Sequence, residues 1–218
     1  EGNITKDTWG NNHGIVVGAT QVDDCVFGKC YSFNGVSDYV EIGDSDTLDL
    51  SDEITVSAFI KPDEKSDTYR TILAKGYASG ENYQLRMDRT SDGNNVSFEV
   101  SVSGSYEGTP KIKINNYQWY HVVGLYNGNK ISIFVNGVNS GSNPLSGSMD
   151  INIEKVLIGK NTHNEFWKGL IDEIRIYNAS LSSSQIKQIY IAGLESLLSK
   201  GTISSSEFKE NIAKMSSN

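Results

Sequence analysis

The chain has 218 residues and a formal net charge of −8, with an isoelectric point of about 4.9. An acidic chain repels phosphate backbones, and no stretch approaches the roughly 20 apolar residues that span a bilayer, so we exclude nucleic-acid binding and membrane insertion. Glycine is abundant (21 residues) and proline scarce (3), which is typical of antiparallel β-proteins with many tight turns. The length predicts one main domain with a small appendage.

Two cysteines, Cys25 and Cys30, lie near the N-terminus in the sequence CVFGKC. Their spacing is longer than that of a redox CxxC pair, and no Cys or His lies near enough in sequence to complete a metal site. We therefore predict a local disulfide, which would place the protein outside the cytosol. Two free thiols in the core are the alternative.

Alternating apolar residues predict strands along the middle of the chain. The segment 54–62 would direct two sets of side chains to opposite faces: Ile54, Val56, Ala58 and Ile60 on one, and Thr55, Ser57, Phe59 and Lys61 on the other. The segment 96–102 repeats the pattern, with Val96, Phe98, Val100 and Val102 against Ser97, Glu99 and Ser101. Shorter strands are expected at 71–76 and 82–88.

The segment 119–141 is the strongest strand signal. Apolar runs flank Asn127-Gly128-Asn129, which tolerates positive φ and so predicts a hairpin, and a second turn follows at Asn136-Gly137. Strands at 155–161 and 169–177 complete the series, and the last is expected to place Leu170, Asp172, Ile174 and Ile176 on one face. Strands at short intervals without intervening helices predict an all-β, two-sheet antiparallel sandwich.

The pattern becomes helical after Leu181. Apolar residues recur at helical spacing from Ile186 to Leu198, and Gly201 would end this helix. The run from Ser204 to Glu207 is a capping signal for a second short helix. We therefore predict a small C-terminal helical hairpin.

Several blocks of the sequence resemble one known family. YSFNGVSDYVEI (31–42), ITVSAFIKPD (54–63), WYHVVGLYNGNKISIFVNG (119–137) and FWKGLIDEIRIYNASLSSSQIKQIY (166–190) are similar, in order, to strands of the concanavalin A-like, laminin-G-like jelly-roll family. The resemblance implies a jelly-roll domain over residues 1–190. The remaining tail, 191–218, resembles the short C-terminal (SHOCT-like) domain, whose implied role is self-association.

The resemblance also implies a structural Ca²⁺ ion between the first blocks and an aspartate of the closing strand. We carry this over to Asp7, Asn34, Asp38 and Asp172, whose side chains offer the oxygen ligands that Ca²⁺ prefers. Asp172 stands among apolar neighbours, where a carboxylate is costly unless it is paired or bound to metal. The alternative is that Asp172 caps backbone N–H groups and that Asp38 belongs to an Asx turn.

Residues that could carry catalysis are not grouped in this sequence. A retaining glycosidase needs two carboxyl groups about 5–5.5 Å apart, but Asp172 and Glu173 are adjacent and would point to opposite faces of a strand. For ligand binding, exposed aromatic rings are the usual platforms for sugars. The candidates in loops are Trp9, Tyr69, Tyr77, Tyr106 and Trp167, and Trp167 could equally be a core residue.

We therefore interpret the chain as a non-catalytic, extracellular or cell-surface binding or adhesion module. Its partner would be a glycan or a surface protein. The alternative is a structural or assembly protein that self-associates through its C-terminal tail, and a glycoside hydrolase is the least favoured class.

Overall fold

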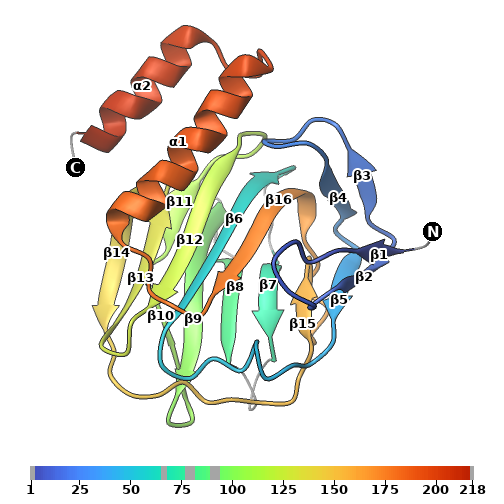
Figure 1. Cartoon of the computed structure of the whole chain (residues 1–218), viewed down its shortest axis with the longest axis vertical. Helices are drawn as coiled ribbons and strands as arrows, with labels where there is room; N and C mark the ends of the chain where they lie inside the picture. Colours follow the sequence, from blue (N-terminus) through green and yellow to red (C-terminus); the bar gives the residue numbers. More distant parts are fainter. Residues whose placement is uncertain (1–2, 65–67, 77–81, 89–93, 217–218) are drawn as a thin grey trace.

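The computed structural model describes residues 3–64, 68–76, 82–88 and 94–216. Two antiparallel sheets pack face to face, and two helices follow them at the C-terminus (Figure 1). The predicted fold class, a jelly-roll sandwich with a C-terminal helical hairpin, is confirmed. Among the described residues, neither helix is long and apolar enough to cross a membrane.

The larger sheet has nine strands and is called the nine-stranded sheet below. Its order is β1 (Ile4–Thr5), β2 (Gly14–Val17), β5 (Tyr39–Ile42), β15 (Val156–Ile158), β7 (Arg70–Lys75), β8 (Tyr83–Asp88), β9 (Asn94–Val102) and β10 (Ser105–Gly108), and β11 (Ile112–Ile114) also pairs with β9. Strands distant in sequence are neighbours, so the chain crosses between the two sheets repeatedly.

The seven-stranded sheet has the order β14 (Val138–Pro144), β13 (Lys130–Val135), β12 (Tyr120–Tyr126), β6 (Ile54–Pro62), β16 (Lys168–Tyr177), β4 (Cys30–Asn34) and β3 (Thr20–Val22). The two Asn-Gly turns connect β12 to β13 and β13 to β14, as predicted. At the second turn, Asn136 and Gly137 have φ values of 52° and 77°, so both lie in the left-handed region that tight hairpin turns require.

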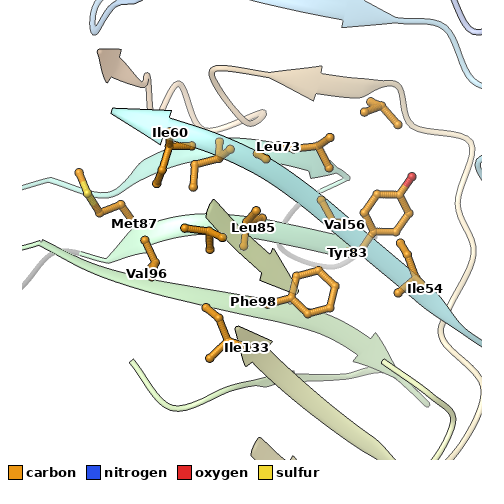
Figure 2. Packing of buried hydrophobic residues seen from close by; sticks show 14 of the residues in the cluster. Ile54, Val56, Ile60, Leu73, Tyr83, Leu85, Met87, Val96, Phe98 and Ile133 are labelled. Carbon is orange, nitrogen blue, oxygen red and sulfur yellow. The ribbon is translucent and has the colours of Figure 1, made fainter. Parts of the chain in front are cut away.

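The core lies between the sheets and is built by the alternation expected from the sequence. Ile54, Val56 and Ile60 of β6 face Tyr83, Leu85 and Met87 of β8 and Val96 and Phe98 of β9 (Figure 2). A Cβ atom on Gly124 would lie 2.1 Å from the Phe98 ring, so only glycine allows the sheets to approach so closely there.

Helix α1 (Ser183–Ser199) packs on the outer face of the seven-stranded sheet, and α2 (Ser205–Ser216) lies against α1 (Figure 1). The apolar side of α1 carries Ile186, Tyr190, Leu194 and Leu197, which pack with Phe59, Val123, Leu125 and Phe134 of the sheet. The boundary expected at residues 190/191 therefore falls inside a continuous helix. That helix shares apolar clusters with the sandwich.

The predicted face of the closing strand needs correction, because β16 contains a β-bulge. The register of β16 against β6 shifts between Asp172 and Arg175, and Glu173 has a φ of 49°. The extra residue moves Ile174 and Ile176 onto the core, where Ile171 also packs. Asp172 lies on the opposite face, beside Phe59, so its neighbours are not the isoleucines that the sequence suggested.

Cys25 and Cys30 form the predicted disulfide. It closes the loop between β3 and β4, which two side chains of the C-terminal region hold in place. The Lys200 ammonium donates to the carbonyl oxygen of Cys25 at 3.0 Å, and the Ser196 hydroxyl donates to that of Val26. The N-terminal loop and the C-terminal helix therefore stabilise each other.

Candidate functional site

The outer face of the nine-stranded sheet carries polar side chains where the other sheet carries apolar ones. In β8 and β9 the apolar residues point into the core, so Gln84, Arg86, Asp88, Ser97 and Glu99 point outwards. The strand register places Gln84 opposite Glu99 and Arg86 opposite Ser97. Hydrogen-bonding and charged groups from two strands therefore form one polar layer, in which Gln84 is fully buried and the Arg86 side chain is 12% exposed.

Arg86 lies at the centre of this surface. Its Nη2 atom lies 2.7 Å from Glu99 Oε1 and 3.2 Å from Asp88 Oδ1, and Lys111 Nζ lies 3.1 Å from the same Asp88 oxygen. Burial alone would lower the pKa of Arg86, but the charges of Glu99 and Asp88 outweigh it and raise that pKa. The guanidinium is therefore fixed in position as a cation.

Two tyrosines stand on either side of this charged centre. The Tyr69 ring lies over the Arg86 guanidinium, with its centroid 4.7 Å from Cζ. The Tyr106 hydroxyl donates to Gln84 Oε1 at 2.8 Å, and Gln84 Nε2 in turn donates to the Thr71 hydroxyl at 2.9 Å. We call the group Tyr69, Gln84, Arg86, Glu99 and Tyr106 the Arg86 site.

The chain matches the concanavalin A-like lectin/glucanases superfamily (Laminin_G_3) over residues 34–187, which is more than half of its length. It belongs to this superfamily. None of the curated protein sequences matches it. The match ends at residue 187, so the resemblance of the tail to the short C-terminal domain stays a prediction.

Solved structures of the same fold include domain 4 of AbnA, an extracellular arabinanase of Geobacillus stearothermophilus, in complex with arabinotriose. It is 23% identical, with a TM-score of 0.64, and the match covers 81% of this chain and 87% of that one. The binding domain of Paraclostridial Mosquitocidal Protein 1 is 14% identical (TM-score 0.68), and that of Botulinum neurotoxin serotype G is 10% identical (TM-score 0.67).

The matches to both toxin domains cover 84% of this chain but only 48% and 47% of those domains. The chain therefore spans about half the length of each toxin binding domain. At these levels of identity the likeness shows the shared fold alone, so the function must be argued from this chain's own residues.

Of the aromatic residues predicted to bind a ligand, the structure brings together Tyr69 and Tyr106. Trp9 is 95% exposed but lies in the loop between β1 and β2, at the opposite sheet edge from the β10 strand of Tyr106. Trp167 is fully buried in the core, which is the other role that the sequence left open for it. Tyr77 lies outside the described residues.

The polar members of the Arg86 site were not among the residues predicted from the sequence to bind a ligand. Gln84, Arg86 and Glu99 occupy alternate positions in the segments 82–88 and 96–102, where the apolar residues were assigned to the core. The signal was present as outward-facing charge in two consecutive strands. Without the register, nothing indicated that Arg86 and Glu99 would meet.

The side chains predicted to bind calcium accept hydrogen bonds from backbone N–H groups. Asp7 Oδ1 accepts from Trp9 N at 2.9 Å and Oδ2 from Asn12 N at 3.1 Å, and the Trp9 hydrogen bond lowers the pKa of Asp7. Asn34 Oδ1 accepts from the N–H groups of residues 36–38 in an Asx turn, and Asp38 Oδ2 accepts from Asn34 N at 3.0 Å.

Asp172 is also engaged, because Phe27 N donates to its Oδ2 atom at 2.8 Å. Burial raises the pKa of Asp172, and the hydrogen bond from Phe27 opposes that rise. Among the described residues, no group of three or more His, Cys, Asp or Glu side chains is arranged to hold a metal ion, so Asp7, Asp38 and Asp172 do not converge. Calcium binding by Asp7, Asn34, Asp38 and Asp172 stays a prediction.

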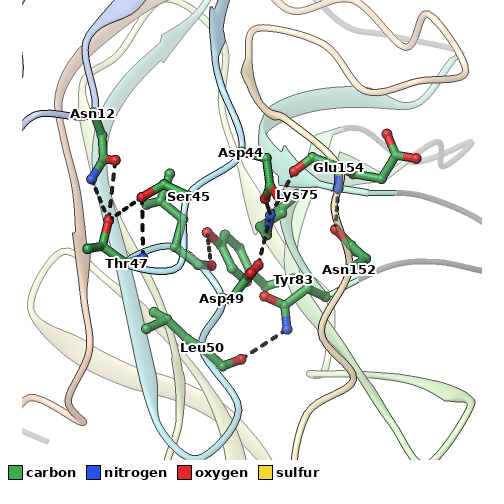
Figure 3. A network of polar contacts seen from close by, with 12 residues as sticks. Asn12, Asp44, Ser45, Thr47, Asp49, Leu50, Lys75, Tyr83, Asn152 and Glu154 are labelled. Carbon is green, nitrogen blue, oxygen red and sulfur yellow. Dashed lines mark hydrogen bonds and ion pairs between the residues drawn. The ribbon is translucent and has the colours of Figure 1, made fainter.

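An oxygen-rich cluster at one end of the sandwich surrounds an ammonium group. Lys75 is fully buried, and its Nζ atom lies 2.5 Å from Asp44 Oδ1, 3.0 Å from Asp49 Oδ1 and 2.7 Å from the carbonyl oxygen of Glu154 (Figure 3). Two connecting loops are thereby joined to β7. The Lys75 ammonium therefore provides the positive charge that balances the oxygen atoms of this cluster.

Proposed function

We propose that this domain is a non-catalytic carbohydrate-binding module and that the Arg86 site holds the sugar. The observation that carries the proposal is the convergence of Tyr69, Tyr106 and Arg86 on one sheet face. Aromatic rings offer an apolar surface to the C–H face of a pyranose or furanose, and charged groups beside them pair with its hydroxyls.

The site is preorganised, which lowers the entropic cost of binding. Tyr106 is 36% exposed, and its hydroxyl is fixed by Gln84. Tyr69 is fixed by the guanidinium beneath its ring. Arg86 and Glu99 pair with each other and are 12% and 10% exposed, so only a small part of their donors and acceptors can meet the hydroxyl groups of a neutral sugar.

The carboxylates of this face support a binding role more than hydrolysis. Asp88 and Glu99 both pair with the same Arg86 nitrogen. A retaining glycosidase uses one carboxyl as a nucleophile and another as a proton donor, and each must reach the scissile bond. Two carboxylates held by one guanidinium are poorly placed for either role.

The neighbouring structures and the disulfide support an extracellular setting. Domain 4 of AbnA belongs to an extracellular arabinanase and was solved with arabinotriose bound, and a disulfide persists only in oxidising surroundings. We therefore infer that this module works outside the cytosol, on a glycan or a glycosylated surface.

The assembly function has less support, because the apolar side of the C-terminal helices is already used. Tyr190, Leu194, Leu197 and Met215 are buried against the chain's own sandwich and each other. Self-association through the tail stays a prediction, and light scattering of the full chain would test it.

Isothermal titration against arabinotriose and a panel of neutral oligosaccharides tests the proposal. We expect Tyr69→Ala, Tyr106→Ala and Arg86→Gln each to weaken binding by at least about tenfold, equivalent to 1.4 kcal/mol. Trp9→Ala is the matched control, because it removes a fully presented aromatic ring from the other sheet edge. Absence of binding across the panel, or loss of binding only in Trp9→Ala, would overturn the proposal.

A further inference from the structure

A cleft lies on the outer side of the seven-stranded sheet, away from the Arg86 site. It is a cleft of about 380 Å³ between α1, β16 and the disulfide loop, and we call it the α1 cleft. Phe27, Ile189 and Ala192 give it apolar walls, and Arg175, Tyr177 and Gln188 give it polar groups. Small-molecule sites usually begin at about 300 Å³, so the cleft can hold a compact ligand.

The β-bulge in β16 directs Arg175 into this cleft. Glu173 takes a left-handed φ of 49°, and the register shift then places Arg175 opposite Ser57 on the outer face. A non-glycine residue in this region is strained, and such strain is concentrated at functional sites. A regular strand would have kept the alternation and placed residue 175 on the other face.

The wall opposite Arg175 is also fixed. The backbone N–H of Phe27 is held by the Asp172 carboxylate, and its ring meets the Phe59 ring edge-on, with centroids 6.1 Å apart. The Cys25–Cys30 disulfide closes the loop that carries it. The buried aspartate and the disulfide therefore serve to position one aromatic wall of the cleft.

The positive charge of Arg175 in the cleft favours a ligand with a carboxylate. Of the described residues that line it, Arg175 alone carries a formal charge, and its side chain is 41% exposed. Glu173 pairs with one guanidinium nitrogen, and Tyr177 also interacts with the group. A guanidinium has five N–H donors in a planar fork that matches a carboxylate, so donors remain beyond these two partners.

We propose that the α1 cleft binds a small organic acid, in which a carboxylate meets Arg175 and an apolar body packs against Phe27 and Ile189. Glu173 offsets part of the positive charge, so the affinity is expected between about 10 µM and 1 mM, or roughly −7 to −4 kcal/mol. This site is independent of the proposed carbohydrate site, because the two lie on the outer faces of different sheets.

The test uses 4-phenylbutyrate as the probe and its uncharged amide as the matched ligand, with binding followed by NMR chemical shifts. We expect the acid to shift the amide signals of Phe27, Tyr177 and Ile189 and to bind at least tenfold more tightly than the amide. A peptide ending in phenylalanine, with a free or an amidated end, distinguishes the source of the carboxylate. Binding of the free-ended peptide as well assigns the cleft to chain ends, whereas binding of the small acid alone assigns it to metabolite-sized acids.

Two variants and one control complete the test. Arg175→Gln removes the charge and Ala192→Trp fills the cleft from the exposed side of α1, and both should abolish binding of the acid. Lys209→Gln changes the net charge equally on exposed α2 and should bind as the wild type does. Equal affinity for the acid and the amide, or unchanged affinity in both cleft variants, would overturn the proposal.

Discussion

The two outer faces of the sandwich differ in chemistry and in what covers them. The seven-stranded sheet presents Phe59, Val123, Leu125 and Phe134, and α1 packs over these residues. On the nine-stranded sheet the side chains that point away from the core include Thr71, Gln84, Arg86 and Glu99, and both helices lie over the opposite side of the molecule (Figure 1). The chain covers its apolar outer face with a helix, whereas the polar side chains of the other face pair with one another at low exposure and Tyr106, at 36% exposure, reaches solvent.

The largest effect is expected from Phe59→Ala, because it opens a cavity under α1. The Phe59 side chain is 2% exposed and meets the rings of Phe27 and His121, so we expect a loss of about 3–5 kcal/mol in the free energy of unfolding. Tyr106→Ala on the other face should cost less than about 1.5 kcal/mol. Urea denaturation compares the two, and equal losses would show that the faces do not differ in structural role.

The free energy of unfolding should also depend on pH, because His121 is buried under α1 on the covered face. Burial, and then the positive charge of Arg175, lowers the pKa of His121 to about 3. In the unfolded chain His121 binds a proton near pH 6.5, whereas in the folded chain it stays neutral at that pH. The free energy of unfolding is therefore highest above pH 6.5 and falls as the pH is lowered below it. We expect about 1.4 kcal/mol to be lost per pH unit between about 6 and 4.

His121→Phe isolates this contribution, because phenylalanine can keep the stacking on Phe59 but does not titrate. The variant loses the 2.9 Å contact between His121 Nε2 and the Ser57 hydroxyl, which lowers stability by an amount that does not depend on pH. Thermal unfolding from pH 7 to pH 4 should therefore show a shallower slope in the variant. Equal slopes in the wild type and the variant would show that His121 is not the source of the pH dependence.

The Cys25–Cys30 disulfide closes the loop that packs beside α1 on the covered face. Reduction, or Cys25→Ser with Cys30→Ser, should lower the free energy of unfolding by about 2 kcal/mol through the entropy of a short loop. The midpoint of thermal unfolding with and without reductant measures this. Binding of a neutral sugar at the Arg86 site should be unchanged in the reduced protein, because the loop belongs to the other sheet.

The smallest effect is expected from calcium. Asp7, Asn34 and Asp38 already accept backbone hydrogen bonds, so 1 mM Ca²⁺ should move the unfolding midpoint by less than about 1 °C relative to a chelator. A larger stabilisation, lost in Asp38→Asn, would establish the metal site that the family resemblance implied.

Much of this fold could be predicted, because strand alternation and Asn-Gly turns are local signals. The face of every residue from Ile54 to Lys61 followed from period two alone. The bulge at Glu173 could not be predicted, since nothing in GLIDEIRIY distinguishes an extra residue from a regular strand. That single residue reversed the expected faces of Ile174 and Ile176.

The candidate site was predicted in part for a related reason. Tyr69 and Tyr106 were selected because exposed aromatic rings bind sugars, which is a property of each residue alone. Arg86 and Glu99 become a site only when β8 pairs with β9 in the observed register, and Trp167 becomes a core residue only when β16 joins the sheet. A sequence pattern shows which residues have suitable chemistry, whereas the register between strands decides which of these residues lie side by side.

The central claim is that the polar outer face of the nine-stranded sheet is the ligand-binding face. Titration of the isotope-labelled domain with arabinotriose and other neutral oligosaccharides, followed by amide chemical shifts, tests it most directly. We predict shifts in β7, β8, β9 and β10 around Arg86, and none in α1 or α2. Shifts confined to the helices or to the loop of Trp9, or no shift with any sugar, would contradict the account.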